Sequence, residues 1–255
     1  MNFNHGSLSK HLIVFAVFSL LSTSLATVQE DAKSEKSSET DIAKRLDAAT
    51  NVLNEIMGTP DKAIPNKVLR DAECIAVVPS MVKIAVGFGG NHGKGVASCR
   101  TASGWSAPAP ITVTGGSFGL QLGGQATDLV MLVMNKKGME HLLSSKFKVG
   151  ADASAAAGPV GRDAAADTDW KMKSELLTYS RSRGVFAGID LSGTAVTQDN
   201  DETHVLYGKT IPFESILTGK VPAPKESRAF LAAIEKYAPR GTQQGSLRRS
   251  GAEPK

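Results

Sequence analysis

The stretch that decides the fold reads WSAPAPITVTGGSFGLQLGGQATDLVMLVM and occupies residues 105–134. Residues 117–123 alternate between large apolar and small or polar side chains, and this period of two predicts a strand with one low-bulk face. Such a face lets another backbone, a helix or a ligand come close. Residues 128–134 are apolar at both parities, which is typical of a strand buried on both faces. The stretch therefore predicts a glycine-faced antiparallel sheet at the centre of the protein.

Helical periodicity flanks this sheet in the sequence. Apolar residues recur at helical spacing over 41–57 and again over 224–237, and a shorter helix is expected over 136–145. We expect the helix over 41–57 to pack one face on the sheet. The alternative is membrane contact, which its mixed acidic and basic polar face does not favour. The predicted fold class is α+β: a glycine-rich, mainly antiparallel twisted sheet or partial barrel with flanking amphipathic helices.

The two ends of the chain differ from its middle. Residues 12–21 are apolar, follow a short polar segment and precede a small-residue cleavage pattern, which indicates a secretory signal, with an uncleaved anchor as the alternative. The predicted organisation is a signal peptide at 1–26, a flexible lead-in at 27–40, a folded domain at 41–238 and a disordered basic tail at 239–255. The mature protein is expected to be exported, periplasmic or extracellular, and soluble or peripherally membrane-associated.

The chain contains two cysteines, Cys74 and Cys99, both in strand-like segments. Export permits a disulfide between them, and a pair of buried free thiols is the open alternative. Two cysteines without a CxxC spacing do not make a zinc site. Asp199, Asp201 and Glu202 have oxygen ligands for a hard cation, but an acidic turn over 198–203 that is simply solvated explains them equally. No metal or other cofactor is expected.

Two glycine-rich segments resemble motifs of catalytic or nucleotide-binding sites. Gly115–Gly119 matches the GxSxG pattern with Ser117 as the nucleophile, yet the strand alternation continues past the serine where a hydrolase needs a sharp turn into a helix. Residues 87–95 miss the spacing of a phosphate-binding loop, and Gly89–Gly93 is predicted to be a turn-rich hairpin loop. The protein is therefore not expected to be an enzyme, and a serine hydrolase centred on Ser117 is the alternative.

The basic residues suggest an anion site. The net charge is +4 and the sequence pI about 9.0, which favours anionic partners but is too weak to indicate nucleic acid. Ten lysines and arginines lie near predicted strand ends, turns and short helices. Whether they converge on one face to bind phosphate headgroups or are scattered solubilising charges stays open. The candidates are Lys83, Lys94, Arg100, Lys136, Lys137, Lys146, Lys148, Arg162, Arg181 and Arg183.

Several long ordered blocks carry a resemblance to a known family. The central stretch, then KFKVGADASAAAGPVGR at 146–162 and LLTYSRSRGVFAGIDLSGT at 176–194, closely resembles the SYLF domain, and the resemblance runs from about Leu46 to Tyr237. Its eukaryotic members include Src-homology-3 adaptor proteins associated with actin and membranes. The resemblance implies a non-catalytic domain that binds phosphoinositides through basic residues and an N-terminal amphipathic helix.

The export signal departs from those adaptor proteins. We therefore expect anionic phospholipid surfaces, with phosphoinositide-like, phosphatidylglycerol or cardiolipin headgroups, to be the partner, and we do not expect actin. A structural envelope protein that docks a partner chain on its glycine-rich face is a further alternative. The oligomeric state stays open.

Overall fold

The computed structural model describes residues 41–59, 63–86, 88–118, 123–161, 174–182, 185–188 and 191–239. The chain divides into two units, Met1–Asp41 and Ile42–Lys255, and the fold described below belongs to the second. The predicted signal peptide, the lead-in and the tail from 240 onward lie outside the described residues. At strand positions 83–86, 88–89, 117–118, 123–125 and 185–188 the structure describes the backbone alone.

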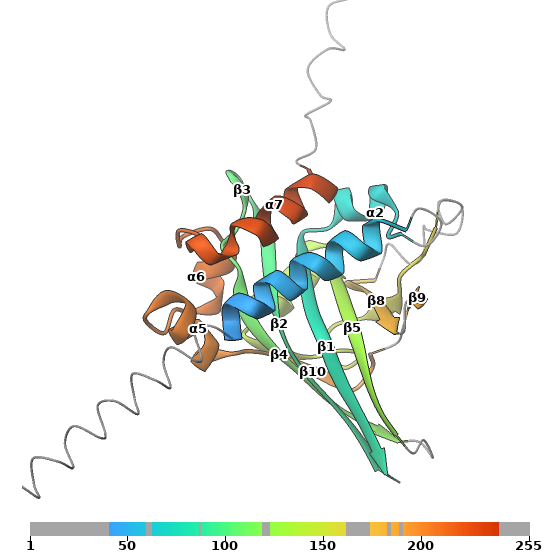
Figure 1. Cartoon of the computed structure of the whole chain (residues 1–255). Coiled ribbons are helices and arrows are strands. Elements are labelled where there is room, and N and C mark those ends of the chain that lie inside the picture. The colour runs from blue at the N-terminus through green and yellow to red at the C-terminus, as the bar shows by residue number, and fades with distance from the viewer. Residues whose placement is uncertain are drawn as a thin grey trace, which may run out of the picture. The chain divides into compact units, whose positions relative to one another are not determined.

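Within the described residues, ten strands form one sheet at the centre of this unit (Figure 1). The strand order is β6-β10-β4-β2-β1-β5-β8-β7, with β3 beside β2 and β9 beside β8. Neighbours are antiparallel, except that β7 runs parallel to β8. The strands are β1 Cys74–Val86, β2 Phe88–Thr101, β3 Gly104–Trp105, β4 Ala109–Phe118, β5 Gly123–Val133, β6 Lys146–Lys148, β7 Ala155–Ala157, β8 Leu176–Ser182, β9 Val185–Gly188 and β10 Thr194–Gln198. The predicted α+β class with a mainly antiparallel sheet is confirmed.

Helices cover the two faces of the sheet. The helices are residues 42–57, α2 Asn66–Asp71, α3 Lys136–Leu143, α5 Asn200–Tyr207, α6 Phe213–Leu217, the 3-10 turn η2 Lys225–Ser227 and α7 Arg228–Tyr237. The first of these, called the N-terminal helix below, lies beside α7 over one face of the sheet (Figure 1), where both enter the same apolar cluster. Residues of α3 and α6 pack in the cluster on the opposite face.

The central strands are buried on both faces. In β1, Ala76 enters the cluster with α3 and α6, and Val77 enters the cluster with the N-terminal helix. In β5, Met131 enters the cluster with α3 and α6, and Val130 enters the cluster with the N-terminal helix. This alternation follows from the period of two in a strand. It confirms that residues 128–134 form a strand with two buried faces.

The N-terminal helix packs on the sheet, as its periodicity predicts. Six of its apolar residues are at most 3% exposed, and Gly58 follows its last turn, where the Gly58 N–H donates to the Asn54 carbonyl at 2.8 Å. The buried residues are Ile42, Leu46, Ala49, Val52, Leu53 and Ile56. No helix in the described residues is long and apolar enough to cross a membrane.

The predicted loop at Gly89–Gly93 is wrong, because β2 runs unbroken through it. Opposite this segment β1 bulges at Pro79–Ser80, where Ser80 has a φ of 51° and both strand ladders shift register. A side chain on Gly93 would meet Val78, and one on Gly95 would collide with the backbone of β1. These glycines allow a bulged strand to approach closely, so they are not turn residues here.

The predicted single strand over 117–123 is also wrong. β4 ends at Phe118 and β5 begins at Gly123, and these two strands are not neighbours. The β1–β2 hairpin lies between them, since Phe118 pairs with Phe88 and Gly123 pairs with Ala85. Residues 119–122 lie outside the described residues.

Candidate functional site

Lys94, one of the ten candidate cations, is held in an ion-pair cluster on β2. Its ammonium lies 2.9 Å from Asp199 Oδ2 and 3.1 Å from Glu202 Oε1, and the hydroxyl of Thr112 donates to Asp199 Oδ2 at 2.9 Å. Burial favours the neutral amine, but the two carboxylates outweigh it and raise the pKa of Lys94. Burial likewise opposes ionisation of Asp199, but the hydrogen bonds from Lys94, the Glu202 backbone and Thr112 hold its pKa below the ordinary value.

The same cluster begins α5 and holds the N-terminal helix. The Asp199 carboxylate accepts from the backbone N–H of Glu202 and so caps the first turn of α5, which shows that the predicted acidic turn is a helix start. Arg45 of the N-terminal helix pairs with Glu202 at 2.8 Å. Cations thus occupy Asp199 and Glu202, two of the three carboxylates considered as metal ligands. No group of three or more metal-ligating side chains occurs among the described residues.

Arg100 serves the ends of two helices. Its Nε donates to the Ala72 carbonyl at 2.8 Å, and its terminal nitrogens donate to the carbonyls of Leu69, Arg70 and Pro239 at 3.2–3.4 Å. The guanidinium also lies over the Trp105 ring, 4.5 Å from its centroid. Burial lowers the pKa of Arg100. Carbonyls at helix C-termini lack partners within the helix, so Arg100 satisfies them and has a structural role.

Two further candidates pair with carboxylates. Arg181 of β8 donates to Asp128 of β5 at 2.6 and 3.0 Å and pairs with Glu55 of the N-terminal helix. Asp128 also accepts from the Ser80 N–H at the bulge of β1, at 2.9 Å. Lys137 lies 2.7 Å from the buried carboxylate of Glu175. These side chains therefore meet carboxylates within the domain.

Besides Lys137, three candidates are exposed to solvent: Lys136, Lys146 and Lys148. Within the described part of the chain their side chains make no hydrogen bond or ion pair. Lys146 and Lys148 flank the buried Phe147 on β6, the strand at one edge of the sheet, and α3 with Lys136 directly precedes it. The remaining candidates, Lys83, Arg162 and Arg183, have side chains outside the described residues. The seven candidates whose side chains are described thus have different surroundings: Lys94, Arg100, Lys137 and Arg181 contact separate groups within the domain, and the three lysines above are exposed.

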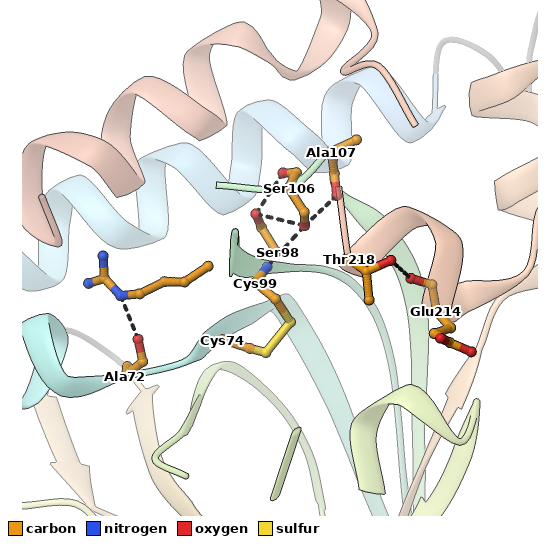
Figure 2. Close-up of a disulfide and its surroundings, with 9 residues drawn as sticks. Ala72, Cys74, Ser98, Cys99, Ser106, Ala107, Glu214 and Thr218 are labelled. Atoms are coloured by element: carbon orange, nitrogen blue, oxygen red, sulfur yellow. Dashed lines mark hydrogen bonds between the residues drawn. A yellow bond between two sulfur atoms is a disulfide. The ribbon is translucent and has the colours of Figure 1, made fainter. Parts of the chain in front are cut away.

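Cys74 and Cys99 are directly opposed on β1 and β2 and are joined by a disulfide (Figure 2). Both are fully buried. Beside them the Ser106 hydroxyl accepts from the Cys99 N–H at 3.0 Å, and the Ser98 hydroxyl donates to the Ser106 carbonyl at 2.8 Å (Figure 2). The disulfide therefore lies in a buried, hydrogen-bonded part of the sheet.

The GxSxG segment lacks the geometry of a hydrolase. β4 runs through Ser117 to Phe118, and the Ser117 backbone pairs with Gly89 of β2, so the serine lies within a strand and not at the end of one. Of the histidines that could act as its base, His141 lies 3.5 Å from Glu175 and His204 is on α5. The structure gives the hydrolase alternative no support.

Sequence reasoning missed Arg45 and Glu202 as partners of the candidate cations. They lie far apart in the sequence, and no local pattern marks two such residues as neighbours. Asp199 did carry a signal: an Asp three residues before Glu202 and ahead of an apolar pair is a helix-capping pattern.

Comparison with known proteins places this fold in a family. The model of the Ysc84 family, described as "Las17-binding protein actin regulator", matches residues 114–237, from β4 to the end of α7. Protein YSC84 of Saccharomyces cerevisiae is 31% identical over 189 residues, which are 72% of this chain and 40% of that protein. LAS seventeen-binding protein 3 of the same yeast is 30% identical over 223 residues, which are 82% of this chain and 47% of that protein.

A human protein is similar to this chain as well. SH3 domain-containing YSC84-like protein 1 of Homo sapiens is 27% identical over 188 residues, which are 73% of this chain and 55% of that protein. The chain spans about half the length of the curated relatives it matches. These relatives are named for binding and for a Src-homology-3 domain, not for a reaction. The chain belongs to the Ysc84 family, the family of the SYLF domain.

Proposed function

We propose that this domain binds anionic phospholipid at a membrane surface, without catalysis, through the exposed lysines of β6. One observation carries the proposal: Lys146 and Lys148 are exposed on either side of buried Phe147, and their ammonium groups form no ion pair with a described carboxylate, although the Lys148 backbone N–H donates to Asp152 Oδ2 at 2.7 Å. Residues two apart in a strand point to the same face, about 6.5 Å apart. The pair therefore presents two free ammonium groups to one surface.

The expected attraction is modest and depends on salt. A lysine near an anionic membrane contributes about 1 kcal/mol, and the interaction is screened over roughly 8 Å at physiological ionic strength. Lys94, Lys137 and Arg181 contribute less, because each already meets a carboxylate within the domain. We therefore expect reversible, peripheral attachment.

We also propose an exported location. The Cys74–Cys99 disulfide is of a kind that persists in oxidising compartments, which agrees with the secretory signal expected at 1–26. In the bacterial envelope phosphatidylglycerol and cardiolipin would supply the phosphate groups. The relatives' names refer to Las17 and actin regulation. An exported domain would meet neither, so we expect no co-sedimentation with actin filaments.

Vesicle sedimentation tests the lipid proposal. We expect the wild-type domain to pellet with vesicles containing phosphatidylglycerol and to release as salt is raised. The double substitution Lys146→Gln with Lys148→Gln should weaken binding about tenfold or more, since about 2 kcal/mol is lost.

The matched control is Lys220→Gln with Lys225→Gln. It removes the same charge from exposed lysines that lie near Glu214 and Glu226. We expect it to bind like the wild type. Equal, salt-independent binding to neutral and anionic vesicles would reject the electrostatic mechanism.

A further inference from the structure

The sheet has an uncovered face beyond the N-terminal helix. β1, β2, β4 and β5 run on past the helices at one end of the sheet (Figure 1). Directly opposed residues of antiparallel strands project from the same face, so the strand register defines a row across six strands. From the sheet edge inward this row is Lys148, Ala195, Thr114, His92, Val82 and Ala126. Each is exposed except Ala195, which is half-buried.

The next row outward along the strands consists mostly of glycine. Register places Gly116, Gly90, Ile84 and Gly124 in line across β4, β2, β1 and β5. A Cβ built on Gly116 would meet nothing within 4 Å, and one on Gly90 would meet a single backbone oxygen at 3.7 Å. Three of the four positions in this row are glycines, and the two whose surroundings are described, Gly90 and Gly116, have little or nothing close above them. We call these two rows the open face.

The open face lacks charge along most of its length. Residues 81–92 contain a single lysine, Lys83, and residues 114–127 contain no charged residue, in a chain that is 21% charged. Val82, in the middle of the first row, is 43% exposed. At the sheet edge the same face ends in Lys146 and Lys148. Charge is therefore concentrated at one side of an otherwise uncharged surface.

We propose that the open face enters the interfacial layer of a lipid bilayer while Lys146 and Lys148 stay at the phosphate groups. This inference rests on the proposed function and deepens it by naming the surface that contacts the membrane. A lipid bilayer has a matching arrangement: its anionic phosphates, which would face the lysines, lie outside, and its apolar chains, which would face the uncharged rows, lie within. The lysines alone give weak attachment, and apolar contact at Val82 adds a component that salt does not screen.

Substitutions at Val82 test the proposal in mixed phosphatidylglycerol and phosphatidylcholine vesicles. In about 0.5 M NaCl, where the Debye length is only about 4 Å, lysine attraction is largely screened. There we expect Val82→Asp to lower binding about tenfold. Val82→Thr keeps the branched shape that a strand favours and should lower it less. The control Val160→Asp alters the other exposed large hydrophobic residue in the described part of the chain, at 37% exposure, and should bind like the wild type.

A fluorescent label reports directly where Val82 lies. Val82→Cys carrying an environment-sensitive dye should shift to the blue on vesicles and be quenched by spin-labelled acyl chains, and labelled Val160→Cys should do neither. If the wild type binds anionic vesicles while the Val82 label stays in water, the inference is overturned and the proposed function stands. If the wild type does not bind anionic vesicles, both this inference and the proposed function are rejected. A second copy of the chain could bind the open face instead of a membrane, and light scattering without lipid tests this by measuring the molar mass in solution. A dimer that Val82→Asp dissociates would assign the face to that second copy.

Discussion

Arg100 illustrates how partners decide the role of a charged residue. In sequence it is a cation at the end of a strand, as Lys146 is. In the fold its guanidinium donates four hydrogen bonds to carbonyls at the end of α2 and just after α7, and its plane lies over Trp105. The indole of Trp105 in turn donates to the Ala238 carbonyl at 3.2 Å. The two side chains together hold the C-termini of two helices against the sheet.

Substitution of Arg100 should therefore affect stability and not lipid binding. We expect Arg100→Ala to lower the free energy of unfolding by about 2–3 kcal/mol, because buried carbonyls lose charge-assisted hydrogen bonds. Arg100→Lys should recover less than half of the loss, since an ammonium cannot replace a planar fork. Urea unfolding measures both, with exposed Arg70→Ala as the control. Folded Arg100→Lys protein that fails to pellet with anionic vesicles would instead assign Arg100 to the lipid site.

At the scale of the element, the N-terminal helix is held by more than its apolar face. Arg45 pairs with Glu202 near one end, and Glu55 pairs with Arg181 near the other. Between them, Asn54 accepts a hydrogen bond from the Tyr237 hydroxyl of α7 at 2.9 Å. Each contact joins the helix to a different element. The helix is thus fixed in place along the sheet, and its buried face is unavailable to a membrane while these contacts persist.

The Asp199 cluster predicts how the domain responds to acid. The lowered pKa of Asp199 means that its carboxylate form stabilises the fold, fully above the ordinary value of 3.8 and progressively less as the pH falls below it. The raised pKa of Lys94 means that its contribution is complete below 10.5 and is lost only as the pH rises beyond that value. At neutral pH both contributions are present.

We therefore expect Asp199→Asn to be less stable than the wild type at neutral pH, by about 1 kcal/mol or more. The difference should shrink as the pH is lowered below about 4, where the wild type also loses its carboxylate. Urea titrations across this pH range measure it. Asp71→Asn, which removes an exposed carboxylate paired with Lys67, is the control and should change stability little. A difference that stays constant with pH would contradict the assignment.

At the scale of the whole molecule, one covalent bond joins the two central strands. The disulfide closes a loop between cysteines 25 residues apart in sequence, and it lies at the start of β1 and near the end of β2, where both cysteines are fully buried. In the chain-entropy view such a loop stabilises the fold by about 3 kcal/mol, by restricting the unfolded chain.

Replacement of both cysteines by serine tests this contribution. We expect the double variant Cys74→Ser with Cys99→Ser to fold but to lose about 3 kcal/mol of unfolding free energy. Denaturant unfolding compares it with wild-type protein under oxidising and reducing conditions. Reduced wild type should approach the variant in stability. Thiol titration of unfolded protein isolated from an oxidising compartment should find no free thiol, and two free thiols per chain would contradict the disulfide.

The sequence by itself determined the local periodicities and therefore the fold class. Apolar residues recur at helical spacing over 41–57, which predicts one buried helix face. Over 128–134 they occupy both odd and even positions, which predicts a strand buried on both faces, because side chains follow the period of each element. Glycine was ambiguous, since a residue without a side chain serves turns and close strand contacts equally. The predicted loop at Gly89–Gly93 proved to be a strand for this reason.

Only the tertiary structure decided which cations are free. Lys94, Arg100 and Lys146 look alike in sequence, and their partners come from segments far away along the chain. Electrostatic pairing depends on distance in space, which no local pattern records. The open face is likewise a product of strand order, because its rows exist only after six separate strands have been brought into register.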